Sequence, residues 1–481
     1  MITWTMGLAL IICTANSAHA EGEPQPYPAI GGKEAKEAKH FRVTVGEVEV
    51  PTVAIGGRFG HMARFAMSGP QTVTIRVADS KPKAVTLRPR RAGIEPKLED
   101  GVLTFRIEKP QNLFIKLDDH PDLHVLAYPP VKAPDGDKVY CAVKDYKIDH
   151  TGKTEALEPI QKALADIAEK GGGTLVFPDG VYDCGIETPI KQRVLSPQSD
   201  TTMFLMPGAL IRRMQLVINK GENIHFAGHG ILDFTKGPGY RQTGSLRANR
   251  IDGLKIQDLV SINRSWNWNT RFDQSSKVTI KNYKIFGGKD GINPVSSSNV
   301  KISDVYIFAV DDCIATKAHD GGGSYEKVHV ENATLLCYRY GGIKIGTETK
   351  ADYIRNITFR NIEIIRAARP AIIQVRDGAK VSNVVMENII VDHAGEAAID
   401  FVIGDARKLR GHIDGVTVRN FVVHSRSKKE RIRLAGYSDE FMIRNVTFEG
   451  LMIEGKPILK LEDIPKLEEQ HTKDITFKAA R

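Results

Sequence analysis

The chain has 481 residues and a formal net charge of +9, with 26% charged and 7% aromatic residues, a composition typical of a folded protein rather than a disordered one. No segment after the first twenty residues approaches the roughly 20 apolar residues that a membrane span requires, and no nucleic-acid recognition motif is present. A basic protein favours anionic partners, and acidic polysaccharide fits that description better than nucleic acid does.

The first twenty residues predict an export signal. They hold an apolar stretch from Met6 to Cys13 and end in Ala18-His19-Ala20, the small-x-small pattern after which signal peptidase cleaves. About 460 residues then remain, more than one ordinary core uses, so we expect two domains or one elongated repeat array. The predicted location is secreted or periplasmic.

Four cysteines follow the predicted signal. Cys141 and Cys184 are a candidate disulfide pair in an oxidising compartment. Cys313 and Cys337 lie inside apolar strands and are at least as well explained as buried thiols. Without a CxxC motif or a Cys/His cluster, the sequence predicts no metal site, and it predicts no cofactor.

Residues 21–135 predict an N-terminal β-sandwich domain. Apolar and polar residues alternate with period two in short runs separated by turn residues, as antiparallel sandwiches require. These runs are 41–45, 72–77, 102–107 and 113–117. Pro129 and Pro130, followed by a polar stretch, predict a linker that ends near Gly136.

Residues 140–481 predict a right-handed parallel β-helix, so the whole chain is expected to be all-β. A single helix over about 155–170, ended by three glycines, would cover the open end of the first coil. A phrase of the form polar–Val/Ile–x–Val/Ile/Phe–x–Asn/Asp then recurs with starts 22 to 32 positions apart, the period of a solenoid coil. The phrase starts at residues 223, 253, 277, 299, 327, 356, 383, 415 and 445.

Three aspartates are spaced by one coil. Asp311 and Asp312 follow Asp290 by 21 and 22 positions, and stacked coils lie about 4.8 Å apart, so the three carboxylates are expected to form one cluster. Repulsion between them would raise at least one pKa and give a proton donor beside ionised partners, as the hydrolysis of an acetal requires. The alternative is that they are ordinary turn residues, as Asp304 is.

The residues around these aspartates resemble the polygalacturonase group, glycoside hydrolase family 28. That family carries an Asn-Thr-Asp-Gly-Ile-Asp phrase and an Asp-Asp-Cys-Ile-Ala phrase at this spacing, and this chain has Asp-Gly-Ile-Asn-Pro at 290–294 and Asp-Asp-Cys-Ile-Ala at 311–315. The resemblance covers roughly residues 143–391. It implies that Asp311 protonates the leaving oxygen while Asp290 and Asp312 hold and deprotonate a water, with inversion at the sugar.

The chain is also similar to the dextranase group, glycoside hydrolase family 49, which joins an N-terminal β-sandwich to a β-helix and uses three Asp.

Several positions depart from the polygalacturonase pattern. Lys289 precedes the first Asp, Asn293 replaces a second one, and Gly341 stands where that family has His. Its Arg-Ile-Lys phrase, which grips the substrate carboxylate, aligns with Gln374-Val375-Arg376, and this predicts a changed sugar specificity.

Aromatic and basic residues near the aspartates are the predicted substrate contacts. We expect Trp266 or Trp268 to stack on a sugar ring. Lys317, Lys344 and Arg376 would place positive charge beside the site and suit a sulfated or uronic sugar. An equally weighted alternative has Lys344 pair with the Asp cluster and keep it ionised.

The predicted function is hydrolysis of glycosidic bonds in a polysaccharide or oligosaccharide. Two alternatives remain open at this point. A polysaccharide lyase on the same scaffold would recast Lys317 or Lys344 as a base and the three Asp as calcium ligands. A solenoid that only binds an anionic glycan is the other alternative.

Overall fold

The computed structural model describes residues 22–29, 39–238, 244–319, 321–404 and 409–480, so the predicted export signal lies outside the described residues. Two mainly antiparallel sheets form the N-terminal sandwich, and one of their pairings, between β5 and β11, is parallel. The first sheet holds β1 (Gln25–Pro26), β4 (Thr52–Ala54), β5 (His61–Ala66), β7 (Val85–Arg88), β10 (Asn112–Leu117) and β11 (Leu123–Tyr128). The second holds β2 (Phe41–Val45), β3 (Val48–Val50), β6 (Gln71–Val77), β8 (Lys97–Glu99) and β9 (Val102–Ile107).

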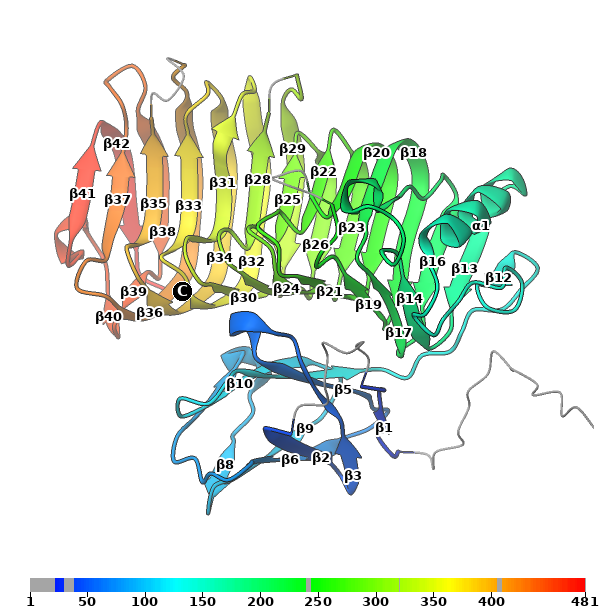
Figure 1. Ribbon diagram of the computed structural model, residues 1–481. Helices are drawn as coiled ribbons and strands as arrows, with labels where there is room; N and C mark the ends of the chain where they lie inside the picture. The colour runs from blue at the N-terminus through cyan, green and yellow to red at the C-terminus, as the bar shows by residue number, and fades with distance from the viewer. Residues whose placement is uncertain (1–21, 30–38, 239–243, 320, 405–408, 481) are drawn as a thin grey trace, which may run out of the picture.

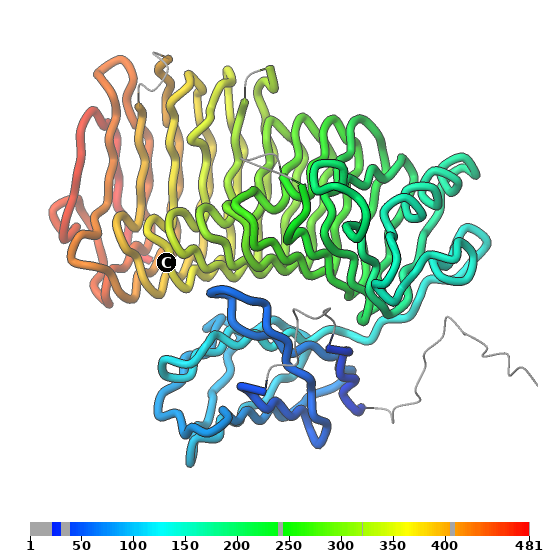
Figure 2. Tube along the Cα trace, viewed as in Figure 1, coloured from blue at the N-terminus to red at the C-terminus, as the bar shows by residue number. Residues whose placement is uncertain are grey.

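The rest of the chain is a right-handed parallel β-helix of 31 strands, from β12 (Val139–Cys141) to β42 (Thr472–Lys478). Figure 2 shows its coils stacked along one axis. Asparagines turn many of the coil corners because Asn tolerates positive φ: Asn356 has φ 57° and Asn383 has φ 52°. The Asn383 side chain donates to Asn356 Oδ1 at 2.7 Å, so the corner residues form a ladder that also links neighbouring coils.

Three faces run along the β-helix. The face that carries the aspartates, here called the cleft face, includes the first halves of β18 (Gln215–Gly228) and β20 (Leu246–Gln257), then β22 (Thr270–Asp273), β25 (Ile292–Val295), β28 (Ile314–Ala318), β31 (Gly341–Thr349), β33 (Arg369–Val375), β35 (Ala397–Ile403), β37 (Arg431–Ala435) and β41 (Leu467–Gln470). A second face includes β17 (Ala209–Arg212), β19 (Ile231–Asp233), β21 (Val260–Asn263), β24 (Lys284–Gly287), β27 (Tyr306–Ala309) and β30 (Thr334–Cys337). The third includes β13 (Gly173–Phe177), β16 (Thr201–Leu205), β23 (Ser276–Lys281), β26 (Ser298–Ser303), β29 (Tyr325–Glu331), β32 (Tyr353–Arg366), β34 (Lys380–Ala394), β36 (His412–Arg426) and β38 (Ile443–Glu449).

A helix closes the N-terminal end of the solenoid. α1 spans Leu157–Glu169, within the range predicted for it, and buries Ile160, Leu164 and Ile167 against the first coils. The helix therefore removes the apolar end of the first coil from water, which is the purpose expected of a cap.

The sandwich packs against the second face of the β-helix and leaves the cleft face uncovered (Figure 1). Phe114 and Tyr128 of the sandwich share an apolar cluster with Phe286 and Phe308 of the β-helix. Buried His124 of β11 joins the two by a 2.7 Å hydrogen bond to Tyr306. A contact that combines apolar packing with a buried hydrogen bond restricts movement between the sandwich and the β-helix.

The four cysteines after the predicted signal are buried, and no disulfide joins them in the part of the chain that the structure describes. The Cys141–Cys184 pairing is therefore not formed here. None of the described helices is both long and apolar enough to cross a membrane.

Candidate active site

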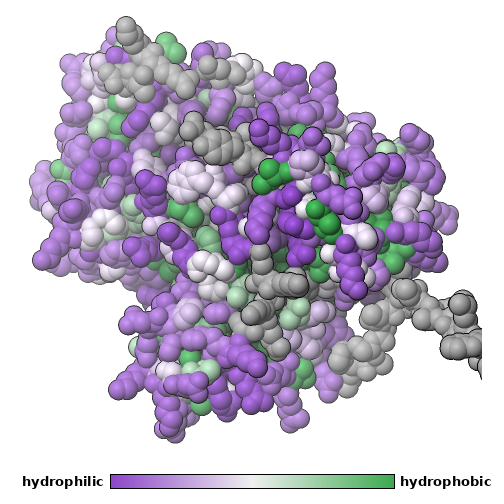
Figure 3. Space-filling view, in the orientation of Figure 1, coloured by the Kyte–Doolittle hydropathy of each residue, from purple (hydrophilic) through white to green (hydrophobic). Residues whose placement is uncertain are grey.

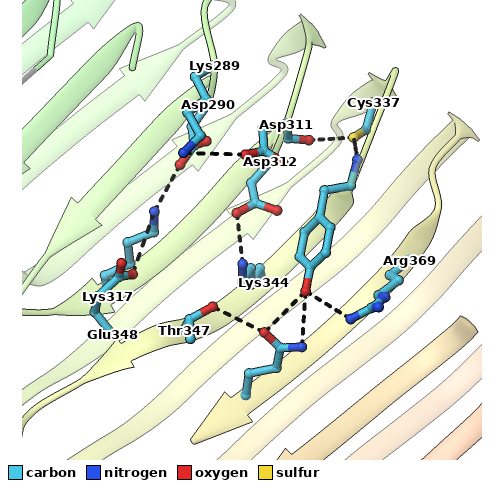
Figure 4. Close-up of polar contacts among 12 residues, drawn as sticks. Lys289, Asp290, Asp311, Asp312, Lys317, Cys337, Lys344, Thr347, Glu348 and Arg369 are labelled. Carbon is cyan, nitrogen blue, oxygen red and sulfur yellow. Dashed lines mark hydrogen bonds and ion pairs between the residues drawn. The ribbon is translucent and has the colours of Figure 1, made fainter. Parts of the chain in front are cut away.

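Asp290 and Asp312 stand at equivalent positions of neighbouring coils. Ile292 of β25 pairs with Ile314 of β28, so the residue two places before each strand also falls into register. The backbone N–H of Gly291 donates to the Asp312 carbonyl at 2.9 Å and fixes this alignment. The structure thus brings Asp290, Asp311 and Asp312 together at one pocket of about 390 Å³ on the cleft face (Figure 4).

Each of the two deeper aspartates is paired with a buried lysine. Lys317 Nζ donates to Asp290 Oδ2 at 2.9 Å, and Lys344 Nζ donates to Asp312 Oδ2 at 3.0 Å. Lys317 also lies over the Trp268 ring, with Nζ 3.7 Å from its centroid. These contacts correspond to the alternative in which Lys344 pairs with the Asp cluster, and they commit both ammonium groups to the protein rather than to a ligand.

The second oxygen of each deep carboxylate is buried without a hydrogen-bond partner among the described residues: these are Asp290 Oδ1 and Asp312 Oδ1. The absence of a side chain at Gly341 leaves room for the Asp312 carboxylate, because a Cβ at residue 341 would lie 2.4 Å from Asp312 Oδ1. A glycine is therefore required where the resemblance expected His. A buried acceptor without a partner costs about 1–3 kcal/mol, and such atoms are typical of sites that take up a ligand.

Asp290 and Asp311 differ in exposure, and the pKa of each is raised. Asp311 is the accessible one, with a side chain 22% exposed against 2% for Asp290. Burial raises the pKa of Asp290 to about 6, although Lys317 opposes the shift. Burial and the nearby Asp312 carboxylate also raise the pKa of Asp311, and Lys289, whose Nζ lies 3.7 Å from Asp311 Oδ2, opposes this.

The two tryptophans have different environments. Trp266 is 50% exposed at the pocket, whereas Trp268 is 1% exposed beneath Lys317. Of the two candidate sugar platforms, only Trp266 presents its ring to solvent. Trp268 is a floor residue that holds the Lys317 ammonium.

Gln374 and Arg376, both predicted substrate contacts, do not line the pocket. Gln374 is fully buried and donates to the hydroxyl of Tyr340 at 3.2 Å, so it supports a lining residue from behind. The alignment of phrases placed Gln374 by its order in the chain. The fold instead seats Tyr340 and Thr347 between it and the pocket.

Several lining residues were not predicted. They are Lys289, Arg339, Tyr340, Thr347 and Glu348. Lys289 was visible as a departure from the family phrase, and Tyr340 lies next to the Gly341 departure. For Arg339 and Glu348 no pattern in the sequence distinguishes them from ordinary surface charges.

A second pocket of about 460 Å³ adjoins the first on the N-terminal side, and Glu348 lines both. Its lining is polar and comes from the coils before Asp290 and from the segment after β28. Besides Glu348, the lining residues are Arg247, Asn249, Arg271, Asp273, Gln274, Val295, Ser296, His319 and Gly322. The two pockets together form a cleft that crosses several coils, over a face that is mostly hydrophilic (Figure 3).

Curated proteins that are similar to this chain are named as probable rhamnogalacturonases. A probable rhamnogalacturonase E of Aspergillus flavus is 26% identical over 281 residues, which cover 54% of this chain and 58% of that protein. A probable rhamnogalacturonase B of Aspergillus terreus is 25% identical over 298 residues, 59% of this chain and 54% of that protein. The chain therefore spans little more than half the length of these curated relatives.

Solved structures share the fold. An exopolygalacturonase from Thermotoga maritima superposes with a TM-score of 0.59 at 15% identity, over 72% of this chain and 94% of that one. Dex49A from Penicillium minioluteum has a TM-score of 0.56 at 12% identity and covers 95% of this chain and 97% of that one. The sequence profile of glycosyl hydrolases family 28 matches residues 217–471, more than half of the chain and the whole of the aspartate-bearing coils. The chain belongs to glycosyl hydrolases family 28.

Proposed function

We propose that this protein is an exported enzyme that hydrolyses glycosidic bonds of a polysaccharide or oligosaccharide, with Asp311 as the general acid and Asp290 and Asp312 as the groups that hold and deprotonate a water. The observation that carries the proposal is the arrangement of three carboxyl groups at one pocket: the accessible Asp311 stands beside the deep Asp290 and Asp312, each of which keeps one oxygen without a partner among the described residues.

Asp311 has the properties of the acid. Burial and the nearby Asp312 raise its pKa, the direction that a proton donor needs, and its exposure lets it reach a leaving oxygen at the pocket mouth. The family relation and the spacing from Asp290 support the same assignment.

Asp290 and Asp312 have the properties of the base. One oxygen of each carboxyl group accepts a hydrogen bond from a lysine, and the oxygens without a partner are acceptors for a shared water. Attack by this water on the sugar face opposite Asp311 would invert the anomeric centre.

A pectic polymer is the proposed substrate class. Relatives named as rhamnogalacturonases support it, as do the basic charge of the chain and a cleft that adjoins the catalytic pocket and has room for further sugar units. The half-exposed Trp266 ring offers an apolar surface for one sugar face.

The lysine contacts weigh against a lyase. Elimination needs a neutral Lys or Arg as the base. Burial disfavours the charged form of Lys344, yet Asp312 outweighs it and the pKa of Lys344 is raised, so this amine stays protonated. Lys317 is likewise committed to Asp290 and Glu348.

The test measures new reducing ends from rhamnogalacturonan and polygalacturonan with wild type and with Asp290→Asn, Asp311→Asn and Asp312→Asn. Each variant should lose at least about 10²-fold in kcat, the usual contribution of a general acid or base. Asp304→Asn is the matched control, because Asp304 sits at a coil corner outside the pocket, where its side chain accepts a 3.2 Å hydrogen bond from the Asn332 side chain. Proton NMR of the first product should show the inverted anomer. Full activity in all three variants contradicts the assignment.

Export is proposed from residues 1–20. Expression with the native N-terminus in a bacterial host should yield a mature chain that begins at Glu21, and mass spectrometry of the periplasmic or culture fraction checks this. An uncleaved chain that stays in the cytoplasm contradicts it.

A further inference from the structure

We propose that Arg339 and Lys289, which line the pocket beside the exposed ring of Trp266, form an anion-recognition site for the carboxylate or sulfate of a sugar next to the scissile bond. This inference rests on the proposed function, because it names the charged group that the same pocket would select.

The charge balance of the pocket singles out Arg339. Four basic side chains line it. Two of them, Lys317 and Lys344, are buried in ion pairs with the deep aspartates. Arg339 is exposed and forms no ion pair with a carboxylate among the described residues. Its charge is therefore available to a ligand, whereas the charges of the two buried lysines are already neutralised.

Both outer cations, Arg339 and Lys289, lie beside the Trp266 ring. Arg339 Cζ lies 5.7 Å from the ring centroid, and Lys289 Nζ lies 5.9 Å from it. A pyranose ring can lay its C–H face on the indole while an anionic substituent reaches the guanidinium, so the three side chains together suit an acidic sugar. Lys289 contributes more weakly, because it also faces Asp311 at 3.7 Å.

The position that the family resemblance assigns to carboxylate binding cannot serve here. Gln374 carries no charge, is fully buried, and bonds to Tyr340, Thr347 and Asp400. Arg339 precedes Tyr340 directly and stands at the pocket itself. Arg339, in the turn before β31, supplies an exposed cation at the pocket, which the neutral, buried Gln374 of β33 cannot do.

The location beside the acid gives Arg339 a second measurable effect. Its positive charge lowers the pKa of Asp311, working against burial and against Asp312. An anion bound to Arg339 would screen that charge and help Asp311 to keep its proton when substrate is present. Removal of the guanidinium should act on free enzyme in the same direction.

The experiment compares Arg339→Gln with wild type on paired substrates: polygalacturonan or rhamnogalacturonan against its carboxyl-reduced form, and a sulfated galactan against its desulfated form. On the charged member that wild type cleaves, the variant should lose about tenfold or more in kcat/KM, whereas on the neutral member the loss should be under about twofold. The pair that shows the difference identifies carboxylate or sulfate. The alkaline limb of kcat/KM should also move to higher pH on the neutral member.

Arg58→Gln is the matched control. Arg58 is an exposed arginine over an aromatic ring, with Cζ 5.1 Å from the Tyr338 centroid, and it does not line the pocket. Its variant should cleave both members of each pair as wild type does. An equal loss on charged and neutral members, or no loss, for Arg339→Gln overturns the anion site.

Binding separates this inference from the hydrolase proposal. Affinity electrophoresis through gels that contain polygalacturonan or sulfated galactan uses Asp290→Asn, which leaves Arg339, Lys289 and Trp266 in place. Arg339→Gln, added to Asp290→Asn, should weaken retardation severalfold in the gel with the charged polysaccharide. It should leave retardation unchanged in a gel with the carboxyl-reduced or desulfated form. If wild type cleaves nothing yet this difference appears, the hydrolase proposal fails and the anion site stands. If cleavage is normal and the difference is absent, the anion site fails alone.

Discussion

The cleft face holds buried carboxylates at two places, three coils apart, and their oxygens are hydrogen-bonded in different ways. Asp400 of β35 is fully buried, and both of its oxygens are bonded, to Arg369 and Gln374 on one side and to Arg433 on the other. Asp290 and Asp312 are as deep, yet each has one oxygen on a lysine and one oxygen without a partner among the described residues.

This difference in bonding distinguishes a carboxylate with a structural role from one with a catalytic role better than burial does. A carboxylate whose lone pairs are all occupied by the protein has no capacity left for water or substrate. The cations also differ, because arginine stays charged at any ordinary pH, whereas a lysine ammonium can lose its proton. We therefore expect the Asp400 group to govern stability and the Asp290–Asp312 group to govern turnover.

Asp400→Ala should give the largest effect on stability. The change leaves Arg433 without its carboxylate and weakens the hold on Arg369, and neither guanidinium can shed its charge. Breaking a buried pair in this way costs about 3–5 kcal/mol, so calorimetry should show a clear fall in melting temperature. Asp252→Asn, at an exposed pair with Lys277, is the control and should melt as wild type does. Loss of turnover by folded Asp400→Ala, with an unchanged melting temperature, would break the comparison.

Lys344→Met should have the opposite effect, with a smaller loss of stability and a larger loss of activity than Asp400→Ala. Asp312 is left buried without its cation, and it can take up a proton, so the stability loss is smaller than in Asp400→Ala. A protonated Asp312 cannot activate water, and kcat at neutral pH should therefore fall about 10²-fold. Initial rates of reducing-end release and a thermal melt on the same sample check both statements. Lys327→Met, at an exposed lysine of β29, should change neither. A variant that melts early but turns over normally would assign Lys344 to structure alone.

The pH dependence sharpens the role of Asp290. Since the pKa of this group is raised to about 6 and the base must be ionised, kcat/KM should fall as pH drops through about 6. The stability contribution has the opposite sign, because a folded pKa above the ordinary 3.8 favours the protonated folded state. That contribution is complete below about pH 3.8 and is lost as pH rises through about 6.

Lys317→Met tests this assignment of the acidic limb. Lys317 opposes the rise in the pKa of Asp290, so its removal should move the limb upward by about one unit. The limb should stay in place in Lys327→Met. A limb that remains at its wild-type position in Lys317→Met would assign it to another group.

Much of the architecture was readable because it follows from local rules repeated along the chain. The recurring Asn or Asp marked the corners, since these residues accept positive φ, and the 22-residue spacing of Asp290 and Asp312 placed them on adjacent coils. The partners of these carboxylates were harder to read. The pairing of Lys344 with Asp312 was one of two open alternatives, whereas Lys317, expected as a substrate contact, instead donates to Asp290 across 27 residues through the packing of neighbouring coils.

The place of Gln374 next to Tyr340, outside the pocket lining, does not follow from its place in the sequence. Gln374 was placed by aligning phrases, but coil lengths vary and β28 pairs with β31 through a register shift, so an alignment of letters does not fix what faces the pocket. The docking of the sandwich through His124 and Tyr306 was equally invisible, because it joins residues 182 positions apart.

Arg247→Ala should give the smallest effect and extends the comparison to the N-terminal side of the cleft. Arg271 in that pocket is held by Asp273 through two bonds of 2.8 and 2.5 Å, whereas Arg247 forms no ion pair among the described residues and its Nε is buried without a partner. By the criterion that separates Asp400 from Asp290, Arg247 is the residue with capacity for substrate. Its loss should raise KM about threefold to tenfold for polymer with kcat unchanged, since it lies away from the reacting atoms. The shortest cleaved oligosaccharide should show no change, and Lys255→Ala, on the same strand but facing another side, should match wild type. An equal rise in KM for short and long substrates would mean that Arg247 shapes the catalytic pocket instead, and the cleft would then contribute no binding beyond it.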